Sequence, residues 1–129
     1  MARSVLIAES NKIFSEALGG ALSLLGFVVV GTTSKKSGVN DLALETKPDL
    51  LIFNCRLSGD ETAGFSDLQH LKEQLPEMKI IALGYHDVVD DVTRKFLKAG
   101  FDGYWNIYDN WAGFLKQLKI LFPGIADLI

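Results

Sequence analysis

The feature that most constrains the fold of this chain is a repeated alternation between short apolar runs and longer segments in which apolar residues recur at three- and four-residue spacing. The spaced pattern predicts amphipathic helices, and a continuously apolar run bounded by polar residues predicts a strand buried on both faces. The runs of the strand type are SVLIA (4–8), FVVVGTT (27–33), DLLIFN (49–54), KIIALG (79–84) and GYW (103–105). Strands and helices that alternate in this way predict a parallel sheet with helices above and below it.

Five helices are expected in the same alternation, and glycine or proline residues mark several of their ends. They run from Ile13 to Leu25 before Gly26, over 38–46 before Lys47-Pro48, from Phe65 to Leu75 before Pro76, from Val88 to Leu97 before Gly100, and over 110–122. Right-handed crossovers leave few arrangements of such elements, and the leading one is a flavodoxin-like, doubly wound α/β fold with strand order 2-1-3-4-5. We assign residues 1–122 to this domain and 123–129 to the start of a linker or a C-terminal extension.

Composition narrows the class of protein further. The chain has 129 residues, enough for one domain with a proper core, of which 48% are hydrophobic and 22% charged. Its single cysteine fits a reducing compartment, and neither a signal peptide nor a membrane-spanning run is evident, so we expect a cytoplasmic protein with no membrane contact. The net charge is −3, and the basic residues form no stripe, which argues against direct contact with nucleic acid.

Ligand sites in doubly wound sheets lie at the carboxyl ends of the strands, near the point where the strand order reverses. In this chain the predicted rim contains Glu9, Ser10, Asn54, Gly84 and Ile107. Any chemistry of the domain is therefore expected at these positions.

Several enzyme and metal interpretations of the rim fail on residue type. The segment AESNKIF after the first strand lacks the glycine-rich turn of a phosphate loop, and Gly19-Gly20 falls inside the first helix, where close packing is the favoured interpretation. His70 and His86 have no partners at ligand spacing, and no base lies near Cys55 in the sequence. We therefore predict no enzyme activity, no metal and no cofactor.

Four segments together carry a resemblance that covers essentially the whole chain. They are SVLIAESNKIFSEALGGALSLLGFVVVGTTS, KPDLLIFNCRLSG, KIIALGYHD and KAGFDGYW. In this order they resemble the receiver domain of two-component response regulators, in the style of receivers that precede helix-turn-helix output domains. The resemblance implies a site built from two acidic residues that help to hold Mg²⁺, a phosphoryl-accepting aspartate, a Thr or Ser, and a Lys.

This chain lacks the expected group at four of the five positions, and of the acidic pair it keeps one carboxylate of two. The acidic pair is Glu9 and Ser10, the acceptor is Asn54, the hydroxyl position is Gly84, and the lysine position is Ile107. An amide is a poor nucleophile and a weaker metal ligand than a carboxylate, and an isoleucine cannot pair with a phosphoryl group. We therefore predict a degenerate receiver, or pseudo-receiver, in which Asn54 caps the next segment or bonds the loop backbone.

The resemblance also implies a switch aromatic on the last strand, which here is Tyr104. We predict that the missing side chain at Gly84 leaves room for one fixed rotamer of Tyr104, so that the switch is locked. Nearby aromatic residues are candidates for a protein–protein interface, because such residues are enriched at interface centres. The candidates are Trp105, Tyr108 and Trp111, in a homodimer that uses part of this cluster or the last helix.

Two functions remain open at this point. The first is a phosphorylation-independent regulatory and protein-interaction module, as part of a transcription regulator. The alternative is a binding domain whose altered rim accepts a small molecule or a nucleotide second messenger.

Overall fold

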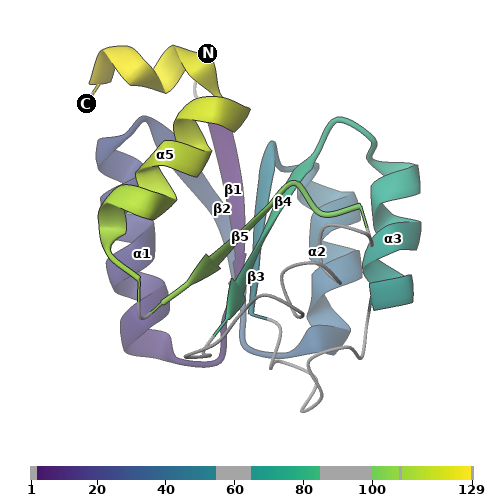
Figure 1. Ribbon diagram of the computed structural model, residues 1–129. Helices are drawn as coiled ribbons and strands as arrows, with labels where there is room; N and C mark the ends of the chain where they lie inside the picture. Colours follow the sequence, from purple (N-terminus) through teal and green to yellow (C-terminus); the bar gives the residue numbers. More distant parts are fainter. Residues whose placement is uncertain (1–2, 55–64, 85–99, 108, 129) are drawn as a thin grey trace.

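The central sheet has five parallel strands in the order β2-β1-β3-β4-β5, which confirms the predicted flavodoxin-like α/β class (Figure 1). The computed structural model describes residues 3–54, 65–84, 100–107 and 109–128. The strands are β1 (Arg3–Ala8), β2 (Phe27–Thr33), β3 (Leu50–Asn54), β4 (Lys79–Gly84) and β5 (Gly103–Asn106).

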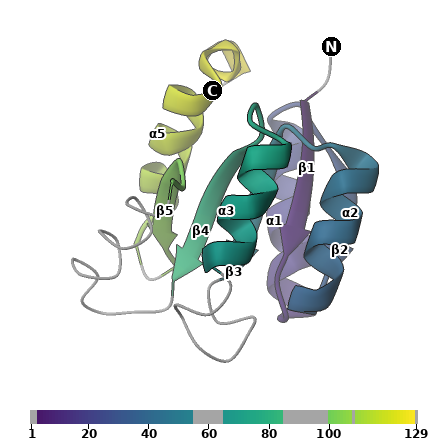
Figure 2. The same cartoon turned by 90° about the vertical axis from the view of Figure 1, so that its right-hand side faces the viewer.

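The helices form a layer on each face of the sheet (Figures 1 and 2). One layer contains α1 (Lys12–Leu24) and α5 (Trp111–Leu121), and the other contains α2 (Val39–Thr46) and α3 (Phe65–Gln74). Two 3-10 helices, η1 (Lys36–Gly38) and η2 (Pro123–Leu128), complete the described elements. The helix predicted from Val88 to Leu97 lies outside the described residues, as do Cys55, His86 and Tyr108.

Two hydrophobic clusters lie between the sheet and these layers. Because successive strand residues point to opposite faces, Ile52 enters the cluster under α1 and α5, and Phe53 enters the cluster under α2 and α3. All five residues of β3 are buried, as are the last four of β1 and the last five of β4. Continuous burial on both faces explains why these strands are continuously apolar in sequence, since each buried aliphatic side chain contributes about 1.5–3 kcal/mol.

Local residue chemistry sets the helix ends. The Oδ1 atom of Asn11 accepts a hydrogen bond from the backbone N–H of Phe14 (3.0 Å) and so caps α1, and Asn110 caps α5 in the same way. After α1 the chain turns at Gly26, whose φ of 90° favours glycine. As predicted from the sequence, α2 ends before Lys47-Pro48. Lys47 itself adopts the left-handed conformation.

The two helical glycines differ in their surroundings. A Cβ atom at Gly19 would lie 3.4 Å from Val29 Cγ2 and 3.7 Å from Ile7 Cδ1, so α1 packs closely on the sheet there. A Cβ atom at Gly20 would meet nothing within 4 Å. The close-packing interpretation is therefore confirmed for Gly19 and wrong for Gly20.

The two outer strands of the sheet, β2 and β5, each have a distinct local feature. In β2, Val29 pairs with Val5 and Gly31 pairs with Leu6, so β2 carries one extra residue as a bulge. In β5, the Gln117 side chain of α5 accepts a hydrogen bond from Tyr104 N–H (2.9 Å) and donates one to the Tyr104 carbonyl (2.7 Å). Gln117 therefore joins α5 directly to the backbone of β5.

The segment after α5 packs on the domain. Ile125 of η2 is fully buried in the cluster under α1 and α5, and the Arg3 guanidinium lies 5.7 Å from the centroid of the Phe122 ring. None of the described helices combines the length and the apolar character that a membrane crossing requires.

Candidate functional site

The rim of the sheet holds a buried polar pair at the ends of β1 and β3. The Nδ2 atom of Asn54 donates a hydrogen bond to Glu9 Oε1 (2.9 Å), and the backbone N–H of Asn11 donates to the same oxygen (3.0 Å). Glu9 and Asn54 are each only 3% exposed. Because β1 and β3 are adjacent and parallel, their ends meet, and the two residues predicted to share the rim do lie together.

The residues present do not fit the magnesium ion that an active receiver requires. Hard cations such as Mg²⁺ bind oxygen atoms, preferably carboxylates, whereas this site offers one carboxylate, one amide and the exposed hydroxyl of Ser10. The Asn54 amide donates a hydrogen bond to an oxygen of the one carboxylate that could bind the ion. Within the described ranges, no three His, Cys, Asp or Glu side chains are grouped as a metal site would need.

Gly84 and Tyr104 share one space at the ends of β4 and β5. A Cβ atom at Gly84 would lie 2.9 Å from Tyr104 Cε2, and nearer still to Cζ and to the hydroxyl oxygen. The tyrosine ring therefore occupies the volume that a side chain at this predicted Thr or Ser position would need. The ring is partly buried and packs against the cluster under α2 and α3.

Ile107 lies at the predicted lysine position and contributes no charge. Its backbone N–H donates a hydrogen bond to the Gly84 carbonyl (3.0 Å), and its side chain packs against the cluster under α1 and α5. The neighbouring Asn106 is a buried polar residue that the sequence analysis did not single out. A polar residue directly after GYW, on the opposite face to Trp105, is the signal that could have found it.

Comparison with known proteins establishes the family. A sequence model described as "Response regulator receiver domain" matches residues 5–106. The chain belongs to the response regulator receiver domain family. It is thus a receiver domain of the kind that acts in two-component signal transduction. No curated protein sequence matches the chain.

Crystal structures of other receivers have the same fold. A LuxR-family two-component response regulator from Aurantimonas sp. SI85-9A1 is 18% identical with a TM-score of 0.81, over 96% of this chain and 87% of that chain. The signal receiver domain of a DNA-binding response regulator from Colwellia psychrerythraea 34H is 23% identical with a TM-score of 0.78, over 92% and 97%. The BeF3-activated N-terminal receiver domain of RstA from Klebsiella pneumoniae is 19% identical with a TM-score of 0.77, over 92% and 98%.

The aromatic residues of this receiver pack largely against one another. The Trp105 ring lies 5.8 Å from that of Trp111 and 4.9 Å from that of Phe114, and its Nε1 donates a hydrogen bond to the Asn110 carbonyl (3.2 Å). Trp105 is only 6% exposed, which leaves little of its surface for a partner, whereas Trp111 is partly exposed. Of the three interface candidates, Trp111 therefore offers the larger described surface.

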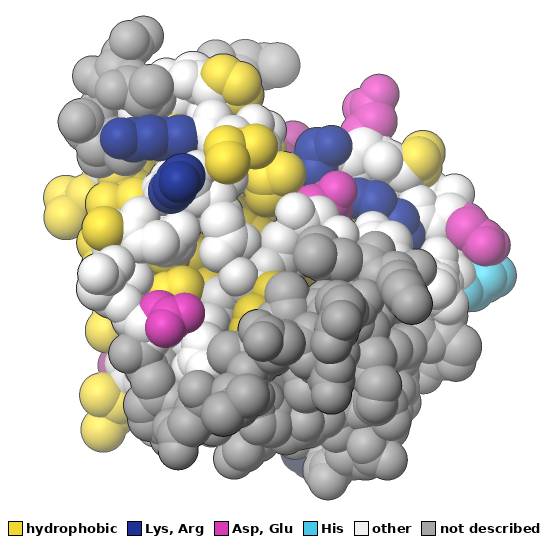
Figure 3. Space-filling view, viewed as in Figure 1, with side chains coloured by type: hydrophobic (Ala, Val, Ile, Leu, Met, Phe, Trp, Pro, Cys, Tyr) yellow, Lys and Arg dark blue, Asp and Glu magenta, His cyan; other side chains and the backbone are white. Residues whose placement is uncertain are grey.

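Apolar side chains that are more exposed than these tryptophans lie on α1 and α5. Ile13 and Leu24 on α1 are 82% and 85% exposed, and Ile120 on α5 is 69% exposed. Hydrophobic side chains are visible on the side of the molecule that these helices form (Figure 3). The sequence analysis did not single out these three residues.

Proposed function

We propose that this receiver is a phosphorylation-independent regulatory and protein-interaction module, cytoplasmic and without enzyme activity of its own. The observation that carries the proposal is the buried hydrogen bond between Asn54 and Glu9. Phosphoryl transfer to a receiver needs an anionic nucleophile, a cation that neutralises the developing charge, and a group that pairs with the product. Here the nucleophile position holds an amide, and that amide already bonds the one remaining carboxylate.

The Tyr104 ring supports the same conclusion from the opposite side of the rim. Tyr104 is the residue that the resemblance to receivers identifies as the switch, and its ring fills the space beside Gly84. A ligand or modification can shift a two-state equilibrium only if it binds the two states unequally. We propose that the second rotamer of Tyr104 is too rarely populated to serve as a switch.

The decisive experiment treats the labelled domain with Mg²⁺ and acetyl phosphate, or with beryllofluoride, and follows the amide NMR spectrum. We expect no shifts at residues 9–10, 54 and 84, while a receiver with an intact acceptor aspartate, run in parallel, responds to the same reagents. Shifts at those residues, or a mass increase of one phosphoryl group on the protein, would contradict the proposal.

We further propose that the module self-associates through the face formed by α1 and α5. Ile13, Leu24 and Ile120 supply exposed apolar area there, and Trp111 adds a partly exposed aromatic ring. Apolar side chains grouped on one face are typical of protein–protein interfaces. A second copy of the same chain is the simplest partner for such a surface, because it brings an identical apolar face.

Sedimentation velocity tests this interface. The wild type should form a dimer as its concentration rises, and the double variant Leu24→Lys/Ile120→Lys should remain monomeric. Leu44→Lys is a matched control, because Leu44 is an exposed leucine on α2, in the opposite layer. A wild type that stays monomeric at high concentration would refute the proposed dimer.

We propose that the module is the regulatory part of a transcription regulator. Support comes from similar structures described as a LuxR-family two-component response regulator and as a DNA-binding response regulator. This receiver carries a net charge of −3, so DNA contact would belong to a separate output domain.

A further inference from the structure

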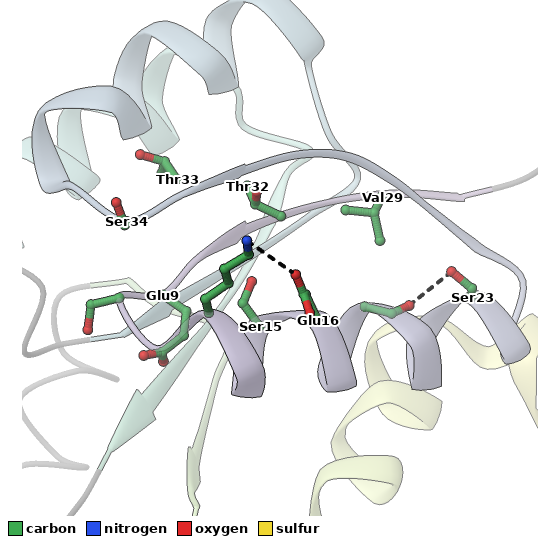
Figure 4. Close-up of a pocket in the computed structure, with 11 residues that line it drawn as sticks. Glu9, Ser15, Glu16, Ser23, Val29, Thr32, Thr33 and Ser34 are labelled. Carbon is green, nitrogen blue, oxygen red and sulfur yellow. Dashed lines mark hydrogen bonds and ion pairs between the residues drawn. The ribbon is translucent and has the colours of Figure 1, made fainter.

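A groove opens between α1 and the edge strand β2, next to the rim of the sheet (Figure 4). Its volume is about 650 Å³, which lies within the range typical of small-molecule sites. Gly19 and Val29 form part of its wall, at the place where α1 packs closely on β2. Glu9 and Ser10 close the end nearest the rim.

Ser15 is the residue that points to a ligand. Its side chain is on α1, only 7% exposed, and its hydroxyl is directed from the helix toward β2 across the groove (Figure 4). Among the described residues, that hydroxyl has no hydrogen-bond partner. Because the hydroxyl oxygen itself is not fully buried, a ligand in the groove can reach it and form a hydrogen bond with it.

Further hydroxyl groups line the same groove. Ser10, Thr32 and Ser34 are exposed there and can both donate and accept hydrogen bonds. Two others are already engaged, because Thr33 Oγ1 donates to the Lys35 carbonyl (3.1 Å) and Ser23 Oγ donates to the Gly19 carbonyl (2.9 Å). The groove thus presents several unengaged hydroxyls beside a small apolar surface.

The charges of the lining disfavour an anion. Lys12 contributes one positive charge, and Glu9 and Glu16 contribute two negative charges, so the formal sum is −1. Lys12 Nζ also lies 3.9 Å from a Glu16 carboxylate oxygen, so its charge is already paired. A phosphate or carboxylate ligand would face a net negative lining, whereas an uncharged ligand would not.

We propose that this groove binds an uncharged molecule that carries several hydroxyl groups, about the size of a disaccharide or a nucleoside. The shared chemistry of both sources is a ring that offers hydroxyls to Ser15, Thr32 and Ser34 and a C–H surface to Val29. The proposal goes beyond the phosphorylation-independent function. Glu9 lines the groove and also bonds Asn54, so the groove adjoins the rim.

Amide NMR titration tests the proposal, with one arm of neutral disaccharides, one of neutral nucleosides, and adenosine monophosphate as an anionic comparison for adenosine. We expect saturable shifts at residues 15, 29 and 32–34 with a dissociation constant below about 10 mM for at least one neutral compound. Saturation in the first arm alone identifies a sugar as the source, and saturation in the second alone identifies a nucleoside. The absence of saturable shifts in both arms would overturn the proposal, as would tighter binding of adenosine monophosphate than of adenosine.

Ser15→Ala separates binding from folding. The variant should unfold at the same temperature as the wild type or higher, because Ser15 lies within α1 and alanine favours a helix more than serine does. Its affinity for the neutral compound should fall about fivefold, the loss expected for one hydrogen bond between neutral groups. Ser37→Ala is the matched control, because Ser37 is an exposed serine in η1 outside the groove lining and should leave the affinity unchanged. Equal affinities of Ser15→Ala and wild type would contradict the assignment.

Discussion

The space shared by Gly84 and Tyr104 makes a sharp prediction about adding a single methyl group. In Gly84→Ala, the new Cβ would lie 2.9 Å from Tyr104 Cε2 and closer to Cζ and the hydroxyl oxygen, so the ring must move out. Gly84 does not have the positive φ that disfavours a side chain, and its backbone can therefore accept alanine. The substitution tests the packing of the ring rather than the conformation of the strand.

Two opposing effects set the expected magnitude. Replacing glycine by alanine on a compatible backbone stabilises a protein by about 0.4–1 kcal/mol through the unfolded state. Overpacking a filled site costs about 1–3 kcal/mol. The larger cost should win, and we expect the free energy of unfolding of Gly84→Ala to fall by about 1–2 kcal/mol.

A double-mutant cycle measured by urea denaturation gives the decisive comparison. In a Tyr104→Ala background the obstruction is gone, so Gly84→Ala should stabilise by about 0.4–1 kcal/mol, and the coupling between the two sites should be about 2 kcal/mol. Gly20→Ala is the matched control, because nothing lies within 4 Å of its added Cβ, and it should stabilise the exposed helix position by about 1 kcal/mol. A coupling below about 0.5 kcal/mol, with unchanged Tyr104 ring resonances in Gly84→Ala, would refute the reasoning.

Three further substitutions test other contacts by urea denaturation. Asn54→Asp puts a second buried carboxylate against Glu9 and should lower the free energy of unfolding by about 2 kcal/mol or more at neutral pH. This loss should shrink as the pH falls, because the folded pair then takes up a proton. A loss that does not depend on pH would contradict the prediction. Gln117→Ala leaves the N–H and carbonyl of Tyr104 without their side-chain partners and should cost about 1–3 kcal/mol, with faster hydrogen exchange of the Tyr104 amide; unchanged exchange would argue against the contact. Asp102→Asn weakens the half-buried ion pair with Lys72 and the hydrogen bond from the Ile80 N–H at the start of β4, and should therefore lower the free energy of unfolding. A loss below about 0.5 kcal/mol would show that this contact is dispensable.

The fold could be predicted because its signals are local and redundant. β3 is buried on both faces and is therefore continuously apolar, and Gly26 and Lys47-Pro48 end their helices for reasons of backbone sterics alone. The meeting of Glu9 and Asn54 followed from strand order, since adjacent parallel strands bring their ends together.

Contacts between distant side chains could not be predicted in the same way. The amide of Gln117 pairs with the backbone of Tyr104 across 13 residues, and nothing in the local pattern of α5 distinguishes it from any exposed glutamine. The sequence predicts Trp105 as an interface candidate, because an aromatic residue suits both a core and a contact surface. Its burial and its packing against Phe114 are visible only in the structure. The Ser15 hydroxyl has no hydrogen-bond partner among the described residues. The position of Ser15 in the sequence therefore could not indicate its surroundings.

The Gln117 side chain has a consequence for how copies of this domain can meet. It occupies the outward N–H and carbonyl of the middle of β5, while the extra residue in β2 distorts the opposite margin of the described sheet. A strand of a second molecule could not form a regular series of main-chain hydrogen bonds along either edge of the sheet. Open-ended, amyloid-like stacking depends on such a series. Assembly of this protein should thus stop at discrete complexes formed through its helices, rather than continue into fibres.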